Sequence, residues 1–377
     1  MRRLVLGKQI LVCIGPGGVG KTTAAAALGV LAARNGRRVL VCTIDPAPRL
    51  ADALGVPGLG PEPRSLTPET SRVLGIGAPG NLQAVRVDTG RAFARLVEEE
   101  VKDQALCARI LANPLYRRMV EDLTGAHEYA ATLVLFDLQR SHAYDLIVLD
   151  TPPTANALDF LATPRRLADA ISSPVWQWLA RRSAKRRLFS LQRLSVGGAL
   201  RSVGKLVGSR FLDDLGAFLL DARDVLGAFL VRARDIDAML RRPEIGFLLV
   251  LSPESAAINE ALYLAGQLRS AGTPLAGFVA NRVLAPPGLV EAKGIRAALA
   301  TLPTLADVGA AQLDAAALQL ANLGAYLAHI TEQQQTELAR LAAQAPGVPI
   351  TRVPLLPHDV SNLESLKAVA DCFAMAG

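Results

Sequence analysis

The feature that most constrains this 377-residue chain is a glycine-rich run near its N-terminus, Gly15-Pro16-Gly17-Gly18-Val19-Gly20-Lys21-Thr22-Thr23. The run matches a glycine, four variable residues, a second glycine, a lysine and a serine or threonine, a pattern that binds nucleotide phosphates. Apolar residues 9–14 before it predict a buried strand, and alanine-rich residues 23–35 after it predict a helix. A strand, this loop and a helix in succession argue against a chance glycine-rich turn.

The chemistry of the run predicts a magnesium–nucleotide site. Its glycines let the backbone pass close to phosphate oxygens with N–H groups pointing inward, and the following helix adds its dipole. Lys21 is expected to reach the β- and γ-phosphates, and the hydroxyl of Thr22 to bind magnesium.

The rest of the chain alternates short apolar segments with helical ones. Further strands are expected at 37–45, 82–88, 144–150, 245–252, 274–283 and 350–356. Helices are expected at 91–142 with breaks near Asn113-Pro114 and Thr124-Gly125, at 155–243, at 254–271, within 289–345 and at 361–375, and residues 56–80 as a loop. This alternation predicts a doubly wound, mostly parallel α/β sheet covered on both faces. Residues 1–154 and 244–377 would form that domain, with 155–243 as an inserted α-helical subdomain.

Two acidic residues end predicted strands, where ligands of doubly wound sheets bind. Asp150 follows Leu146-Ile147-Val148-Leu149, the usual form of a Walker B strand, and is expected to hold magnesium directly or through water. Asp45 opens the loop Asp45-Pro46-Ala47-Pro48, which suits a residue that orients or deprotonates an attacking water. The alternative for each is a helix cap or a turn residue.

Taken together, the glycine-rich run, Asp45-Pro46-Ala47 and Asp150-Thr151-Pro152-Pro153-Thr154 resemble the ATPases of arsenite efflux and of tail-anchored membrane-protein targeting. That family has a deviant Walker A motif and the SIMIBI type of P-loop NTPase fold. The resemblance covers nearly the whole chain, including the helical insertion and the last strand.

The resemblance implies a set of site residues. Phosphate and magnesium binding would fall on Gly17, Gly18, Val19, Gly20, Lys21, Thr22 and Thr23. Asp45 would lie in switch I and activate water, and residues 150–154 would begin switch II. Asn281 would contact adenine. Because Arg282 follows Asn281, the guanine-reading sequence Asn-Lys-x-Asp is absent, which favours ATP over GTP.

The chain departs from the family pattern in three places. The signature lysine that crosses a dimer interface falls on Pro16, which has neither charge nor N–H. The resemblance favours a homodimer, and Pro16 removes one reason for it. Ala155-Asn156 stand where Gly-His is usual. The cysteines Cys13, Cys42, Cys107 and Cys372 are scattered, so they predict neither a zinc pair nor an arsenite cluster, and they fit a reducing compartment.

The basic charge of the chain is concentrated in one segment. Residues 161–243 contain 16 Lys and Arg against 7 Asp, and residues 170–212 contain no acidic residue. Such a segment can bind an anionic membrane surface or accept a hydrophobic helix client, so residues 170–243 are the candidate partner surface. The apolar stripe from Leu215 to Leu240 is better explained as packing within the subdomain. Nucleic acid is a weaker hypothesis, because no recognised nucleic-acid motif accompanies the charge.

The leading hypothesis is therefore an ATP-hydrolysing switch that couples Mg-ATP binding and hydrolysis to capture and release of a hydrophobic client. A slow or non-hydrolysing nucleotide-binding scaffold, docked on a membrane or protein, is the alternative, and an arsenite-efflux subunit is less favoured. A small-molecule kinase fits Asp45-Pro46-Ala47 poorly. No apolar run is long enough to span a bilayer and the N-terminus does not match a signal peptide, so a cytoplasmic protein, peripheral at the membrane, is expected.

Overall fold

The computed structural model of the chain describes residues 1–77, 81–122, 126–152, 220–288, 291–360 and 362–375, together with residues 169, 217 and 218. Most of the predicted subdomain at 155–243 therefore lies outside the described residues. So do the acid-free stretch at 170–212 and residues 153–156 of the predicted switch II.

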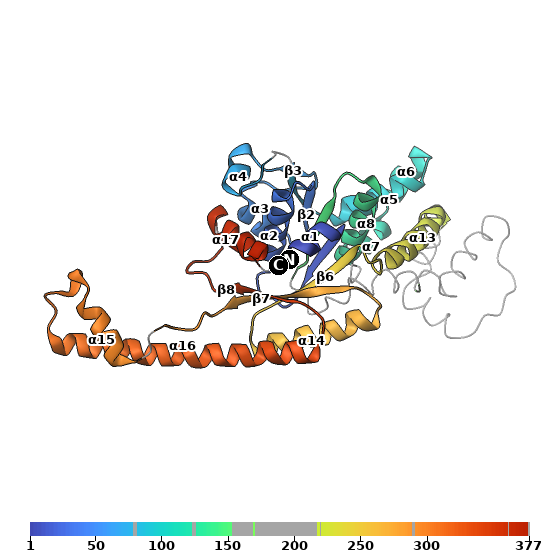
Figure 1. The fold of residues 1–377 in the computed structure, drawn as a ribbon. Coiled ribbons are helices and arrows are strands. Elements are labelled where there is room, and N and C mark those ends of the chain that lie inside the picture. Colours follow the sequence, from blue (N-terminus) through green and yellow to red (C-terminus); the bar gives the residue numbers. More distant parts are fainter. Residues whose placement is uncertain are drawn as a thin grey trace, which may run out of the picture.

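A single eight-stranded sheet organises the described part of the molecule (Figure 1). Its order is β3-β4-β2-β5-β1-β6-β7-β8. Its strands are β1 (Ile10–Ile14), β2 (Val39–Thr43), β3 (Arg64–Ser65), β4 (Leu82–Arg86), β5 (Leu146–Asp150), β6 (Ile245–Leu251), β7 (Leu275–Val283) and β8 (Ile350–Pro354). All neighbouring strands are parallel except β3 and β4. The predicted doubly wound, mostly parallel α/β fold is confirmed.

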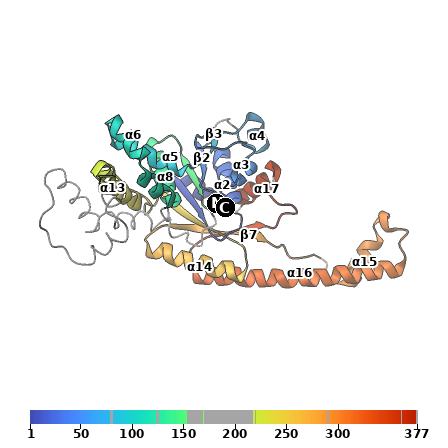
Figure 2. The ribbon, with the colours of Figure 1, turned by 180° about the vertical axis from the view of Figure 1, so that it is seen from behind.

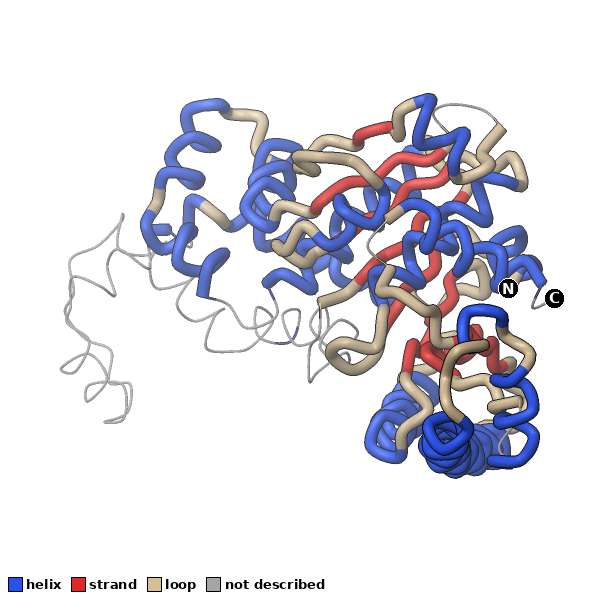
Figure 3. The backbone as a smooth tube through the Cα atoms, turned by 90° about the vertical axis from the view of Figure 1, so that its left-hand side faces the viewer, coloured by secondary structure: helices blue, strands red, loops and turns tan. Residues whose placement is uncertain are grey.

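Helices cover both faces of this sheet, as Figure 3 shows from the side. One apolar core lies under α1 (Arg2–Gly7), α2 (Lys21–Arg34), α3 (Arg49–Leu54), α4 (Pro68–Val73) and α17 (Leu363–Met375). The other includes residues of α5 (Thr89–Glu100), α6 (Gln104–Ala112), α7 (Pro114–Asp122), α8 (Ala126–Ser141), α13 (Arg223–Met239) and α14 (Ser255–Ser270). Side chains of successive strand residues point to opposite faces, so Val12 joins one core while Leu11 and Cys13 join the other.

The limits of several elements differ from the sequence prediction. The helix expected at 23–35 begins two residues earlier, because Gly20 adopts a left-handed conformation with φ of 95° and forms the N-cap of α2. The expected loop at 56–80 contains the short strand β3 and the helix α4. The break expected at Asn113-Pro114 is present between α6 and α7.

The apolar stripe predicted between Leu215 and Leu240 is packing surface where it is described. Phe218, Phe229 and Ile236 are buried in the same core as α5 and α8. The Phe229 ring lies 4.5 Å from that of Tyr129, between ring centroids. These side chains therefore pack in the core of the described fold.

The C-terminal third of the chain adds an arm, formed by α15 (Ala292–Ala300), the 3-10 turn at Pro303–Leu305 and the N-terminal half of α16 (Ala310–Gln344). The arm extends well beyond the sheet, while the C-terminal half of α16 lies along α14 (Figures 1 and 2). Its own core is small and consists of Ile295, Ala317 and Ala321. None of the described helices combines the length and apolar composition that a bilayer-spanning segment needs.

Candidate nucleotide-binding site

The predicted site residues meet at the carboxyl edge of the sheet. Strand β1 lies between β5 and β6, and the chain continues from it to β2 on one side and later to β6 on the other. A doubly wound sheet binds its ligand in the crevice at such a reversal. The glycine-rich loop leaves β1 at this point, and Asp150 ends the neighbouring β5.

Two glycines of the loop have positive φ and leave no room for a side chain. Gly15 has φ of 149°, and an added Cβ there would lie 2.1 Å from the carbonyl oxygen of Val250. Gly20 has φ of 95°, and its added Cβ would lie 2.3 Å from Nδ2 of Asn281. A larger residue at position 15 would force the loop away from the backbone of Val250, and one at position 20 would strain the left-handed backbone and displace the Asn281 side chain.

Asn281, predicted to contact adenine, holds the loop from β7. Its Nδ2 donates a hydrogen bond of 2.8 Å to the carbonyl oxygen of Val19. The next residue, Arg282, has a positive φ of 59°, and the pairing of β7 with β8 is irregular there. The structure thus places Asn281 beside the phosphate loop, and its contact with a base stays a prediction.

Lys21 is folded back onto the loop that precedes it. Its Nζ donates hydrogen bonds to the carbonyl oxygens of Gly15 (3.0 Å) and Pro16 (2.7 Å), and the residue is 6% exposed. Burial lowers the pKa of its ammonium group. Phosphate oxygens would be stronger acceptors than these carbonyls, because both partners would then be charged.

Asp150 is a buried carboxylate with one oxygen still available. Its Oδ2 accepts hydrogen bonds from the hydroxyls of Thr22 (2.8 Å) and Thr43 (3.1 Å). Its Oδ1 is buried and has no hydrogen-bond partner among the described residues. Burial raises the pKa of Asp150 to about 6. A buried carboxylate oxygen beside a threonine hydroxyl is a donor set that Mg²⁺ prefers, so these residues fit the predicted ion.

Asp45 lies in a turn that ties it to the same cluster. Its backbone N–H donates to Oγ1 of Thr43 (3.2 Å), so Thr43 connects Asp45 with Asp150. The Oδ1 of Asp45 accepts from the N–H of Ala47 (2.9 Å), and its Oδ2 pairs with Nη1 of Arg49 (3.4 Å). The turn interpretation of Asp45 is therefore satisfied in this structure, and the same turn brings the residue to the site.

The loop and this turn enclose one cavity of about 870 Å³, a volume suited to a nucleotide. Its walls include Gly18, Gly20, Lys21, Thr22, Thr23, Asp45, Arg49, Asp52 and Thr151. Sequence reasoning missed Thr43 and Arg49. The signal for Thr43 was the register of the sheet, because Thr43 and Asp150 end adjacent strands and pair directly.

A glycine-rich loop of this pattern after a central strand, with Asp150 at the end of the adjacent strand, defines the P-loop class of nucleotide-binding proteins. The second acid, Asp45, was expected to end a strand but lies two residues beyond β2, in the turn. Residues 8–292, more than half of the chain, match the model of the anion-transporting ATPase family. The chain therefore belongs to this ArsA-type family of ATPases.

Individual relatives agree with this family. A putative arsenical pump-driving ATPase of Aquifex aeolicus is 23% identical over 96% of this chain and 78% of its own length. The ATPase GET3 of Malassezia globosa is 25% identical over 74% of this chain and 73% of its own length. An uncharacterized Streptomyces coelicolor protein is 34% identical over 53% of this chain, and the match covers 45% of that relative.

Proposed function

We propose that this chain is a magnesium-dependent, ATP-hydrolysing switch. The observation that carries the proposal is Asp150, a buried carboxylate with one oxygen bound by the threonine hydroxyls and the other without a partner among the described residues. An unpaired buried oxygen costs free energy unless a ligand satisfies it. Its place beside Lys21 and the nucleotide-sized cavity supports a metal–phosphate ligand.

Each residue of the cluster has a role in this proposal. A bound magnesium ion would supply positive charge that offsets the charge of the phosphates. Thr22 and Asp150 would hold the ion, and Lys21 would donate to the phosphates once it leaves the carbonyls of Gly15 and Pro16. Asp45 would orient the attacking water and accept its proton. Asn281 and the absence of a guanine-reading motif support ATP as the nucleotide.

Thr43 supports coupling between the two acidic loops. Its hydroxyl accepts from the Asp45 backbone and donates to Asp150, so displacement of one loop disturbs the hydrogen bonding of the other. We propose that this coupling reaches residues 155–243, and that the basic, acid-free stretch at 170–212 there serves a hydrophobic helix client or an anionic membrane surface. A cytoplasmic homodimer is part of this proposal.

One observation favours the alternative of a slow or non-hydrolysing scaffold. Both carboxylate oxygens of Asp45 already have a partner, the Ala47 N–H and Arg49, and these contacts make the carboxylate a weaker base. Under this alternative the chain binds ATP and docks on its partner without turnover. An arsenite-efflux role would instead show as stimulation of turnover by arsenite.

The test measures ATP affinity and phosphate release side by side, with and without Mg²⁺. Lys21→Ala is expected to weaken ATP binding at least about tenfold, because a charge-assisted contact is lost. Asp45→Asn is expected to lose turnover without any weakening of ATP binding, whereas Asp52→Asn, an acid that lines the same cavity, is the matched control and is expected to keep both. If the Lys21→Ala variant hydrolyses ATP at the wild-type rate, the phosphate-loop assignment is refuted. Binding without turnover in the wild type would establish the scaffold.

Client capture needs its own measurement. Pull-down of a hydrophobic transmembrane-helix peptide by the full chain is expected to be stronger with ATP than with ADP. Equal capture in the two nucleotide states would contradict a nucleotide-driven switch.

A further inference from the structure

The cavity contains a second cation that the proposed function does not use. Among the described residues that line it, Lys21 and Arg49 carry positive charge, and they come from different walls. Lys21 is in the phosphate loop, whereas Arg49 begins α3, directly after the turn that contains Asp45. A nucleotide triphosphate places several negative charges in this space, so both cations are relevant to it.

The side chain of Arg49 makes only a weak contact with Asp45. Its guanidinium pairs with Oδ2 of Asp45 at 3.4 Å, longer than a well-formed charge-assisted hydrogen bond, and its side chain is 61% exposed. The Asp45 side chain is only 13% exposed, but the long contact and the exposed guanidinium keep the contribution of this pair small. Arg49 can therefore exchange Asp45 for a better acceptor at small cost.

The electrostatic balance around Arg49 changes when a nucleotide enters. Burial lowers the pKa of Lys21, and the nearby guanidinium of Arg49 contributes in the same direction, so the two cations are close enough to interact. Phosphate oxygens between them would remove that repulsion. A planar guanidinium can also bind a phosphate through two parallel hydrogen bonds, which the single contact with Asp45 does not provide.

We infer that Arg49 is a phosphate-binding residue that contacts Asp45 in the nucleotide-free protein and transfers to the terminal phosphate of ATP, leaving Asp45 free to act on water. The inference rests on the proposed function and adds a residue and an order of events to it. The pair between Arg49 and Asp45 then keeps the water-activating carboxylate occupied until a triphosphate arrives. ADP, which lacks the terminal phosphate, leaves the pair intact.

Nucleotide binding by calorimetry tests this directly, independently of turnover. Arg49→Gln is expected to weaken ATP binding at least about tenfold and ADP binding less than about threefold, with Arg49→Lys in between. Arg91→Gln is the matched control, because Arg91 is a half-exposed arginine (52%) that pairs with Glu62. It is expected to change neither affinity. If Arg49→Gln binds ATP and ADP each with the affinity of the wild type, the inference is overturned.

A double-mutant cycle tests the exchange of partners. Asp45→Asn releases Arg49 and is expected to tighten ATP binding severalfold in the wild-type background, but much less in the Arg49→Gln background. The same factor in both backgrounds would show only the loss of a repulsive carboxylate and would refute the exchange. Lys21→Ala distinguishes failure of the proposed function from failure of the inference about Arg49. If Lys21→Ala leaves ATP binding unchanged, the proposed function fails. If it weakens binding while Arg49→Gln does not, this inference alone fails.

Discussion

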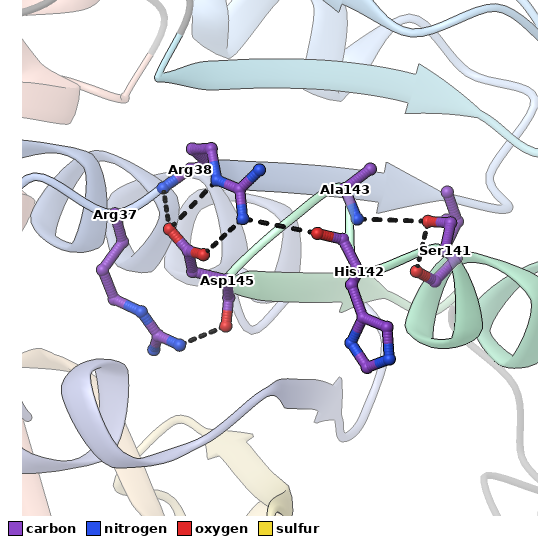
Figure 4. Close-up of polar contacts among 7 residues, drawn as sticks. Arg37, Arg38, Ser141, His142, Ala143 and Asp145 are labelled. Atoms are coloured by element: carbon purple, nitrogen blue, oxygen red, sulfur yellow. Dashed lines mark hydrogen bonds and ion pairs between the residues drawn. The ribbon is translucent and has the colours of Figure 1, made fainter.

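The two edges of the same sheet each hold a cluster of charged residues, and the clusters differ in how completely they are satisfied. At the amino edge, Arg38 donates to Asp145 from its backbone N–H and its guanidinium, both at 2.8 Å, and to the carbonyl oxygen of His142 (Figure 4). Arg37 donates to the carbonyl oxygens of Val5, Lys8 and Asp145. The hydrogen bonds from Arg38 lower the pKa of Asp145.

The carboxyl edge shows the opposite pattern. Asp150 has a raised pKa because burial outweighs its hydrogen bonds, and one of its oxygens lacks a partner among the described residues. Lys21 bonds to neutral carbonyls of its own loop. The same kinds of side chain therefore satisfy one another at the amino edge and leave hydrogen-bonding capacity unused at the carboxyl edge. The incomplete cluster marks the site more sharply than charge alone does.

Removal of the Asp150 charge should have the largest effect. Asp150→Asn is expected to lower Mg²⁺-dependent ATP turnover at least about a hundredfold, because a ligand and a charge at the phosphates are both lost. Steady-state phosphate release at a series of Mg²⁺ concentrations measures this. Asp145→Asn is the matched variant at the other edge and is expected to retain turnover. Equal losses in the two variants would break the distinction between the edges.

The same Asp150→Asn variant should be more stable than the wild type in the absence of nucleotide. A folded-state pKa of about 6, above the ordinary aspartate value of 3.8, means that the folded state binds the proton more tightly, so this group lowers stability as pH rises between those values. The stability advantage of the variant should grow through that window and level off above it, at up to about 3 kcal/mol. Urea unfolding from about pH 4 to pH 8 measures it, and a pH-independent difference would contradict it.

The sequence predicts those features of the two edges that depend on neighbouring residues, and it does not predict contacts between residues far apart in the chain. The sheet was predictable because β1, β5 and β6 are continuous apolar runs, whereas the exposed two-residue strand β3 has no such pattern. Gly15 to Thr23 and Asp150 could be predicted as site residues because each belongs to a motif of adjacent residues, and their roles stay predictions. Thr43 was missed because its partner is 107 residues away and is brought to it only by strand register.

Thr43→Val tests whether that missed hydroxyl belongs to the site. The substitution keeps the shape of a buried side chain and removes the bonds to Asp150 and to the Asp45 backbone. With one hydrogen bond fewer, the Asp150 carboxylate is oriented less firmly and its pKa rises, so protons compete better with the ion and the Mg²⁺ concentration for half-maximal turnover should rise about three- to tenfold. An unchanged Mg²⁺ requirement would show that Thr43 only supports the strand.

At the amino edge, removal of a carboxylate charge should lower the stability of the fold and leave turnover unchanged. Asp145→Asn is expected to destabilise the fold by about 1 kcal/mol, a modest value because the pair with Arg38 is partly exposed and screened by solvent. Since the pKa of Asp145 is lowered, its contribution is present above the pKa of the unfolded chain and is lost as pH falls through the folded-state pKa. Chemical denaturation at neutral and acidic pH checks both points, and a loss that persists unchanged in acid would contradict the assignment.

The smallest effect is expected at His142, which follows the last residue of α8 in a left-handed conformation with φ of 50°. Its carbonyl bonds to Arg38, while its ring points away from the cluster in Figure 4. His142→Gly relieves the unfavourable φ and should raise the free energy of unfolding by up to about 1 kcal/mol, less the entropy cost that glycine adds. ATP affinity, measured alongside, should not change, because the edge where His142 lies serves the fold. Loss of ATP binding in this variant would show that the amino edge also reaches the nucleotide site, and the contrast between the two edges would fail.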